Sequence, residues 1–210
     1  MPFMSYQPSV EAAVKNAGRL VQEGGAEGVK LEGGEPVLPQ VRAIGAAGIP
    51  VVGHLGFTPQ SQAREYYLFS DRRGTVPKFQ GKGPRGAKTL VEQALRLEDA
   101  GVFALVLELV TEEAAQVVTE RLEIPVIGIG AGRHCDGQVL INHDLVGLND
   151  EDLVLAKAYG QTRRAWLDIF TAYRQEVEEG RFPTADNVAH MDPDKRAKLD
   201  ELLKGNGQGR

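Results

Sequence analysis

This sequence has little cysteine, no long apolar run and no large excess of either charge. The chain has 210 residues with one cysteine, Cys135, which excludes an intrachain disulfide and fits a reducing compartment. No apolar run approaches the ~20 residues that a membrane-spanning helix needs, so we expect no membrane partner. The net charge of −5 gives no electrostatic reason to expect nucleic acid as a ligand.

The first residues also lack the basic region and apolar core of a secretory signal. We therefore expect a cytoplasmic protein, or a mitochondrial one if the source is a eukaryote. The overall composition, 42% hydrophobic and 25% charged, is that of a globular protein large enough for one sizeable core.

Short apolar runs alternate along the chain with segments of helical periodicity. The runs predict strands at 28–32, 50–54, 102–108, 124–129 and 138–142. Helical stripes are predicted at 10–23, 35–47, 88–100, after Thr111 and at about 155–179, with Ser9 and Thr111 as N-caps. Such alternation predicts an α/β fold with a parallel sheet, either a β/α barrel or a doubly wound sheet. Functional residues are then expected at the carboxyl ends of the strands.

Charged side chains and a histidine stand at three of these strand ends. Lys30 and Glu32 are two residues apart, so on a strand they point to the same side. They suit a substrate carboxylate and a hard divalent cation, or equally a structural ion pair. His54 could orient a substrate or be a satisfied core histidine. Six of the seven residues before Glu108 are apolar, and dry surroundings favour a general base over a buried acid satisfied by backbone donors.

The glycines of Gly128–Gly132 suggest a nucleotide-binding loop only at first sight. The dinucleotide fingerprint requires glycine at the place of Arg133, and no helix start follows. A tight turn with close backbone approach is the better interpretation. His134 and Cys135 suit a metal by residue type, but no second cysteine or histidine lies at zinc-like spacing.

Residues 55–85 break the alternation of strands and helices and are predicted to form a long loop over one face. The basic residues of this loop are Arg72, Arg73, Lys78, Lys82 and Arg85. They suit a lid over an anionic ligand, such as the glutamate tail of a folate, although a solvated surface loop explains them equally well.

Five segments at and around the strand ends form a recognisable set. They are Val29–Gly34, Gly53–Ser61, Val106–Glu108, Ile124–Gly132 and Asp136–Leu140, in that order, and Met1–Tyr6 belongs with them. Together they resemble the ketopantoate hydroxymethyltransferase (3-methyl-2-oxobutanoate hydroxymethyltransferase) family, over roughly residues 1–183. We expect 1–183 to form a partial β/α barrel catalytic domain and 184–210 a polar, poorly ordered tail.

The resemblance implies a (β/α)8 barrel of the phosphoenolpyruvate mutase/isocitrate lyase superfamily, assembled as a homo-oligomer. It implies transfer of a one-carbon unit from 5,10-methylenetetrahydrofolate to 3-methyl-2-oxobutanoate, with Mg²⁺. The product is 2-dehydropantoate (ketopantoate), in the pantothenate branch of the coenzyme A pathway. Carried over by motif, Lys30 would contact the 2-oxoacid and Glu32 would belong to the metal site. Glu108 would accept a proton, and His54 would line the pocket.

The chain also departs from the family pattern. The family's Gly-Asp-Ser motif, which supplies a metal-binding aspartate, is absent, and a second such aspartate normally precedes the segment that begins here as Met1-Pro-Phe. We therefore expect about the last five β/α units of a barrel. The family's Gly-Tyr-x-x-Gln-Gly loop is altered, with only Gln80-Gly81-Lys82 retained.

Two other interpretations stay open. One is a truncated, catalytically inactive homologue or interaction fragment that lacks the two metal-binding aspartates. The other is a carbon–carbon lyase of the same superfamily acting on a different oxoacid. Lyases of that group carry a catalytic cysteine loop, and Cys135 stands at a different place in the sequence.

Overall fold

The computed structural model describes residues 1–61, 78–149 and 156–205. By their internal contacts the residues form two compact units. The first comprises Met1–Leu145 with Glu151–Lys157, and the second comprises Val146–Asp150 with Ala158–Arg210. Among the described residues, no helix is both long and apolar enough to cross a membrane.

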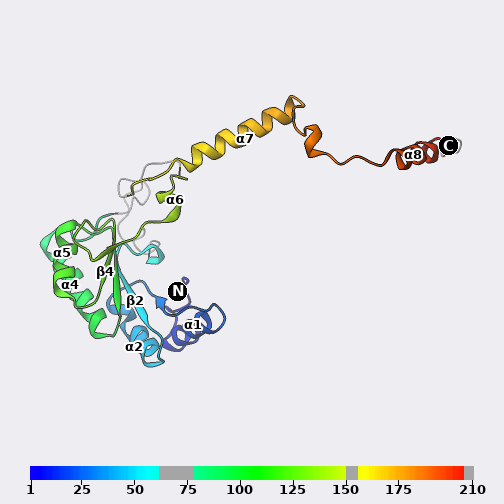
Figure 1. Ribbon diagram of the computed structural model, residues 1–210. Helices are drawn as coiled ribbons and strands as arrows, with labels where there is room; N and C mark the ends of the chain where they lie inside the picture. The colour runs from blue at the N-terminus through cyan, green and yellow to red at the C-terminus, as the bar shows by residue number, and fades with distance from the viewer. Residues whose placement is uncertain (62–77, 150–155, 206–210) are drawn as a thin grey trace, which may run out of the picture. The chain divides into compact units, whose positions relative to one another are not determined.

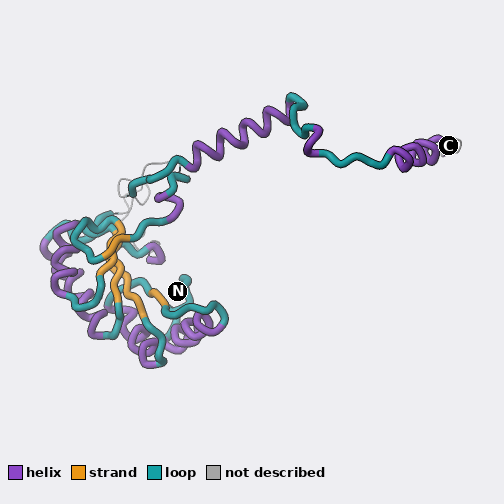
Figure 2. Tube along the Cα trace, in the orientation of Figure 1, coloured by secondary structure: helices purple, strands orange, loops and turns teal. Residues whose placement is uncertain are grey.

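A parallel sheet forms the centre of the first unit. Its strands are β1 (Val29–Lys30), β2 (Val51–Gly56), β3 (Ala104–Glu108), β4 (Val126–Ile129) and β5 (Gly137–Gln138). They lie side by side in the order of the sequence, and every neighbouring pair is parallel (Figure 2). The predicted α/β fold with a parallel sheet is therefore confirmed, and all five strand ends face the same edge.

Helices cover one face of this sheet (Figure 1). They are α1 (Val10–Gln22), the short turn η1 (Glu35–Val37) with α2 (Leu38–Ala46), α4 (Pro84–Asp99) and α5 (Glu112–Arg121). Leu97 of α4 and Leu105 of β3 are fully buried in the shared core. Gly53 faces the same layer, because a Cβ placed on it would lie 3.3 Å from Leu97 Cδ1. Burial of these apolar groups supplies the main free energy that holds the layers together.

Alternation along the strands sends the polar residues to the other face. On β3, Leu105 and Leu107 are buried beneath the helices, whereas Val106 and Glu108 are only partly buried. His54 on β2 pairs with Val106 across the ladder, so its side chain is on the side of Glu108. The sheet therefore carries an apolar helix-covered face and a second face that ends in charged residues and a histidine.

Several predicted boundaries shift by a few residues. The first strand is shorter than predicted, because its ladder ends at Lys30, and α4 begins at Pro84 rather than at 88. The predicted strand at 138–142 is limited to Gly137–Gln138 and is followed by a short helix, α6 (Asn142–Leu145). Ser9 caps α1 as predicted, since its Oγ accepts the Ala12 N–H at 3.1 Å.

Thr111 stands at the N-cap position of α5, but its side chain makes no capping bond. Its hydroxyl instead donates to the carbonyl of Gly81 at 3.0 Å, from a segment 30 residues earlier in the chain. The prediction that the Thr111 side chain caps α5 is therefore wrong, because the hydroxyl bonds the Gly81 carbonyl instead of a backbone N–H of the helix.

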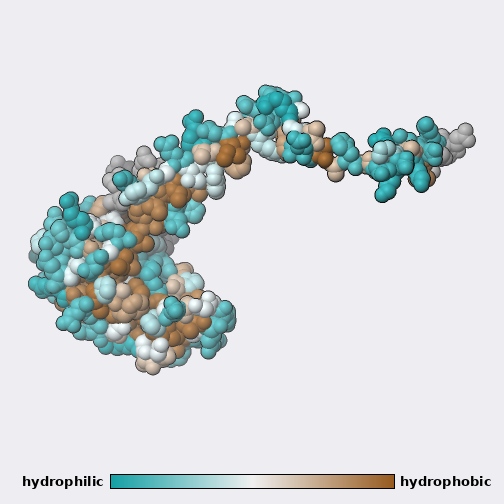
Figure 3. All heavy atoms as spheres, viewed as in Figure 1, coloured by the Kyte–Doolittle hydropathy of each residue, from teal (hydrophilic) through white to brown (hydrophobic). Residues whose placement is uncertain are grey.

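The second unit is built from helices. Its elements are α7 (Thr162–Glu178), the short turn η3 (Ala185–Asn187) and α8 (Pro193–Gly205). The apolar stripe predicted for the last long helix lies on α7, where Trp166, Phe170, Tyr173 and Val177 are all exposed. Figure 3 shows hydrophobic residues at the surface along this helix. Residues 184–205 contain η3 and α8, and the poor order expected for this tail stays a prediction.

Candidate active site

The four residues singled out at the strand ends lie together. His54 stands between the others: Lys30 Nζ is 3.0 Å from its Nδ1, and Glu108 Oε2 is 3.2 Å from its Nε2. Glu32 Oε1 is 3.8 Å from Nδ1. Three adjacent parallel strands bring these groups to one edge of the sheet, as predicted for catalytic residues in such folds.

The contacts of His54 indicate which ring nitrogen carries the proton. A lysine ammonium has only donors, so the short contact with Lys30 assigns Nδ1 as the acceptor of a neutral imidazole. The proton of that tautomer is then on Nε2, which faces Glu108. The imidazole is almost fully buried, with 2% of its side chain exposed.

Nε2 of His54 lacks a hydrogen-bond partner. Although it is within ion-pair distance of Glu108, the two groups are not aligned as a hydrogen bond, and no other described group takes this role. Unpaired buried polar atoms are costly in native proteins. The Nε2–H of His54, beside the Glu108 carboxylate, is thus available to donate a hydrogen bond to an oxygen of a bound molecule.

Glu32 is held by residues far away in the sequence. Its Oε2 accepts the backbone N–H of Gln60 at 3.0 Å. The buried Tyr6 hydroxyl lies 3.2 Å from both the backbone N and O of Glu32 and donates to Gln60 Oε1 at 2.9 Å. Gln60 Nε2 in turn donates to the Met1 carbonyl. We call Tyr6 and Gln60 the Glu32 clamp, because together they fix the backbone and the carboxylate of this residue.

Neither clamp residue was predicted as part of the site. Tyr6 lies in the apolar Met1–Gln7 segment and Gln60 in a Thr-Pro-Gln-Ser turn, 54 residues apart. The signal for Tyr6 was a single tyrosine in an apolar segment without helical or strand periodicity. Burial raises the pKa of the Tyr6 phenol above its ordinary value, and the charge of Glu32 adds to that rise, while a hydrogen bond with the Glu32 backbone opposes it.

Glu108 is more open than the apolar run before it suggested, with 22% of its side chain exposed. The reason is the alternation of β3, which buries Leu105 and Leu107 on the opposite face. The next residue, Leu109, has a φ of 53°, a left-handed conformation that costs a non-glycine residue about 1–2 kcal/mol. The strained turn directly after Glu108 ends the strand and marks a constrained position.

A close approach of two strand ends fixes the backbone of Glu108. Its carbonyl accepts the Phe57 N–H at 2.7 Å. A Cβ on Gly56, whose φ is +93°, would lie 2.1 Å from that carbonyl oxygen, so only glycine fits there.

The site offers one carboxylate for a hard cation. Glu32 is the candidate, with 10% of its side chain exposed. Among residues 1–61, 78–149 and 156–205, no three His, Cys, Asp or Glu side chains gather as a metal cage. Mg²⁺ often takes only one or two carboxylates and completes its shell with water and substrate oxygens. The donor set therefore fits a cation held largely by its substrate.

The glycine-rich loop after β4 contributes no such centre. Glu112 contacts two side chains at the tip of this loop. Arg133 Nε lies 2.8 Å from Glu112 Oε1, and His134 Nε2 lies 3.4 Å from the same oxygen. Cys135 is half-buried, and burial raises the pKa of its thiol. The loop runs on to β5 without a helix start, so the dinucleotide interpretation stays rejected.

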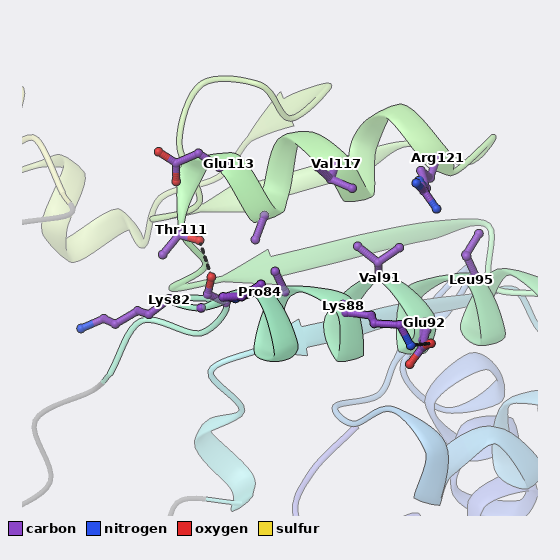
Figure 4. Close-up of a pocket in the computed structure, with 14 residues that line it drawn as sticks. Lys82, Pro84, Lys88, Val91, Glu92, Leu95, Thr111, Glu113, Val117 and Arg121 are labelled. Atoms are coloured by element: carbon purple, nitrogen blue, oxygen red, sulfur yellow. Dashed lines mark hydrogen bonds and ion pairs between the residues drawn. The ribbon is translucent and has the colours of Figure 1, made fainter.

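A groove of about 620 Å³ lies between α4 and α5, on the helix side of the sheet (Figure 4). Val91, Leu95 and Val117 line it together with Lys82 and Arg121. None of the four predicted site residues is part of it. Of the basic residues predicted to form a lid, Arg72 and Arg73 are outside the described residues, so that hypothesis stays a prediction.

The matching family model and three relatives of this chain share one description. A family model described as ketopantoate hydroxymethyltransferase matches residues 1–185. The 3-methyl-2-oxobutanoate hydroxymethyltransferase of Pseudothermotoga lettingae is 48% identical over 189 residues, which are 90% of this chain and 68% of that protein. The protein of the same name from Clostridium kluyveri is 48% identical over 193 residues, 91% of this chain and 66% of the relative.

A third relative extends the match along the chain. The 3-methyl-2-oxobutanoate hydroxymethyltransferase of Clostridium botulinum (strain Alaska E43) is 45% identical over 200 residues, 95% of this chain and 70% of that protein. The chain thus spans about two thirds of the length of these relatives. A crystal structure from Burkholderia cenocepacia J2315, provisionally assigned as a lyase/mutase, aligns over 90% of this chain and 64% of its own. Its identity is 16% and its TM-score 0.40.

Proposed function

Because the chain belongs to the ketopantoate hydroxymethyltransferase family, we propose that it transfers a one-carbon unit from 5,10-methylenetetrahydrofolate to 3-methyl-2-oxobutanoate. The product would be 2-dehydropantoate. The observation that carries the proposal is the bridging of Lys30 and Glu108 by the buried His54. Lys30 and Glu108 lie on opposite sides of one imidazole. A small oxoacid needs such a cation for its carboxylate and such a base for its acidic C–H.

Lys30 and His54 would bind and orient the oxoacid. The Lys30 ammonium pairs with the substrate carboxylate, and the unpaired Nε2–H of His54 donates to a substrate oxygen. His54 is fixed before the substrate arrives, since its side chain is buried and its Nδ1 is held by Lys30. Such preorganisation lowers the cost of placing C3 beside the base.

Glu108 would take the proton from C3 of the oxoacid. The resulting carbon nucleophile would form a C–C bond with the methylene carbon of the folate, and both bonds from that carbon to the two folate nitrogens would break. A water molecule would supply the hydroxyl group of the product. The proton from C3 and the remaining proton of the water would go to the two nitrogens, so tetrahydrofolate leaves as the second product. The side-chain exposure of Glu108 gives its proton a route to solvent after each turnover.

Glu32 would supply the protein's carboxylate to Mg²⁺. When bound, the cation would act as a Lewis acid on the oxoacid and lower the cost of removing its proton. The Glu32 clamp holds one oxygen of this carboxylate on the Gln60 N–H and leaves Oε1 directed toward the His54 side of the site. The chain's own contribution is then to orient a single hard donor.

We further propose that β1–β5 form one arc of a closed (β/α)8 barrel and that the chain works as a homo-oligomer. The strict parallel order of the strands, with α1, α2, α4 and α5 together on one face, supports the barrel arrangement. The apolar stripe of α7, which is exposed within the second unit, supports assembly, because stripes of this kind are usually covered by another surface and a second copy of the chain would supply one.

The test is deuterium exchange at C3 of 3-methyl-2-oxobutanoate in D₂O, followed by NMR without folate. We expect Mg²⁺-dependent exchange, and we expect Glu108→Gln to slow it about 100-fold or more, the usual scale of general-base catalysis. Binding of the oxoacid should change little, since Lys30 and His54 remain.

The matched control is Glu113→Gln, an exposed acid in the first turn of α5. It should exchange at the wild-type rate. Exchange by Glu108→Gln at that same rate would contradict the assignment of the base. Absence of exchange by the wild-type chain with Mg²⁺ would instead favour the inactive-homologue interpretation.

A further inference from the structure

The two carboxylates of the site are held in different ways. Glu32 is fixed through its side chain, because its Oε2 accepts the Gln60 N–H. The Glu108 carboxylate has only its ion-pair contact with His54, and it makes no hydrogen bond with any residue that the structure describes. The direction of the Glu108 side chain therefore depends on where its backbone places the Cα–Cβ bond, and not on partners of the carboxylate.

This difference suits the tasks proposed for the two acids. Hydrogen bonds to a carboxylate favour its charged form and so make it a weaker base. A base that is positioned through its backbone keeps its carboxylate oxygens open to take up a proton. The segments that fix the backbone of Glu108 then matter for proton removal, even though they touch no substrate.

Three separate segments bond the backbone at and after Glu108. The Glu108 carbonyl accepts the Phe57 N–H at 2.7 Å, from the segment that follows β2. The Leu109 N–H donates to the Ile129 carbonyl at the end of β4, at 3.0 Å. The Leu109 carbonyl accepts the Gln80 N–H at 2.7 Å. Every polar backbone group from the Glu108 carbonyl to the Leu109 carbonyl therefore has a partner outside β3.

These bonds meet at a residue with an unfavourable backbone conformation. Leu109 has a φ of 53°, in the left-handed region that L-residues other than glycine, asparagine and aspartate rarely adopt. Such a conformation persists only where the surrounding structure enforces it. An extended residue at this position could not keep all three bonds, because its peptide groups would point away from Phe57 and Ile129. We call Glu108–Val110 the Glu108 turn.

The residues Gln80 and Gly81, which we call the strap, hold the Glu108 turn from outside the sheet. Gln80 forms a parallel bridge with Val110, and its carbonyl accepts the Thr111 N–H at 3.0 Å. The Thr111 hydroxyl donates to the Gly81 carbonyl at 3.0 Å, a bond drawn as a dashed line in Figure 4. A Cβ on Gly81 would lie 2.8 Å from the Ala114 Cβ, so the strap lies directly against the start of α5.

We propose that Leu109 and the strap position the base of the reaction, an inference that rests on the proposed function because it takes Glu108 as that base. The left-handed turn at Leu109 directs the Glu108 side chain toward Nε2 of His54, where the oxoacid binds. The strap keeps the turn in place through its bonds to Leu109 and Thr111. Leu109 and Thr111 are thus positioning residues, which act on the substrate only through Glu108.

The first test compares Leu109→Gly with Leu109→Val in deuterium exchange at C3 of 3-methyl-2-oxobutanoate, at a temperature where circular dichroism shows both folded. Glycine adopts the left-handed turn freely but removes a buried side chain. Valine keeps apolar bulk but disfavours the turn. We expect Leu109→Gly to catalyse C3 exchange about tenfold faster than Leu109→Val, since a small displacement of a base costs much of its rate. A residue that only fills the core would give the opposite order.

The second test alters the strap and leaves the turn residue unchanged. Thr111→Val removes the bond to Gly81 and should slow C3 exchange about threefold, a modest loss because the backbone bonds of the strap remain. Thr111→Ser keeps the hydroxyl and should exchange faster than Thr111→Val. Thr119→Val is the matched control, because its hydroxyl donates to the Ala115 carbonyl, and it should exchange at the wild-type rate. Oxoacid affinity, measured by calorimetry, should be equal in all of these proteins.

A double-variant cycle shows whether the strap acts through the base. In Glu108→Gln, adding Thr111→Val should slow C3 exchange no further, and an additive loss would overturn the inference. So would faster C3 exchange by Leu109→Val than by Leu109→Gly. If the wild-type chain shows no C3 exchange with Mg²⁺, the proposed function fails and amide hydrogen exchange tests the turn by itself. The Leu109 amide should then exchange faster in Thr111→Val than in Thr119→Val, and equal amide rates would overturn the role of the strap.

Discussion

The Tyr6 hydroxyl joins three parts of the chain that are distant in sequence: its own segment, the end of β1 and the turn at Gln60. Tyr6→Phe removes this hydroxyl and leaves the ring in place. We expect the free energy of unfolding to fall by about 1–2 kcal/mol, since buried polar partners lose their bonds. Urea denaturation measures the change. Tyr173→Phe, at an exposed ring, should cost much less, and equal losses in the two variants would contradict the role of the clamp.

The same phenol gives the protein a dependence on alkaline pH. Burial raises the Tyr6 pKa above the ordinary value of 10.0, so between the unfolded and folded pKa values the folded state holds more protons. Stability from this group is complete below the unfolded pKa and is lost as the pH rises through the folded pKa. The wild-type chain should therefore lose more stability above about pH 10 than Tyr6→Phe. Parallel pH profiles for the two proteins would contradict this.

At the scale of elements, the hydroxyl of Thr111 links the start of α5 to the segment that enters α4. Thr111→Val keeps the shape and removes the bond to the Gly81 carbonyl. We expect about 1 kcal/mol of lost stability and faster amide hydrogen exchange at Gln80–Gly83. Thr119→Val is the matched control, because its hydroxyl donates to the Ala115 carbonyl and contacts the Cys135 thiol, neither of which belongs to the Gln80–Gly83 segment. Unchanged exchange at Gln80–Gly83 in Thr111→Val would show that the link is not used.

Local patterns in the sequence predicted the elements better than the contacts between them. Apolar runs located the strands, and Lys30, His54 and Glu108, each within two residues of a strand end, lie together because parallel strands share a carboxyl edge. The prediction of Ser9 as a helix cap also depended only on neighbouring residues, and it is confirmed. Gln60 and Tyr6 could not be found this way, since their role depends on a contact between residues 54 apart.

Part of the site environment also escaped prediction. The apolar run before Glu108 suggested a dry carboxylate, but alternate residues of a strand face opposite sides and only one side is under the helices. The partner of Thr111 was missed for a related reason: the sequence shows a capping residue but not a competing carbonyl.

At the scale of the whole molecule, the exposed stripe of α7 predicts self-association. Trp166, the chain's only tryptophan, stacks edge-on against Phe170 on this stripe. We expect oligomers by light scattering at micromolar concentration, with Trp166 fluorescence shifting to the red on dilution as the stripe meets water. Phe170→Glu should move the equilibrium toward monomer.

The matched control for this prediction is Arg174→Gln, an exposed polar change on the same helix. It should leave the oligomers intact. A wild-type chain that is a monodisperse monomer with a sharp cooperative melt would contradict the prediction. So would a Phe170→Glu variant that assembles as the wild type does.

The sequential order of the five strands has a consequence for synthesis on the ribosome. From β2 onward each strand pairs with the one translated just before it, so β2–β5 can each join the growing edge without a later partner. Lys30, Glu32, His54 and Gln60 all belong to the first 61 residues, and only Glu108 comes from a later strand. The site can therefore be assembled in the direction of translation. The proposed base, Glu108, is added last to strands that already hold Lys30, Glu32 and His54.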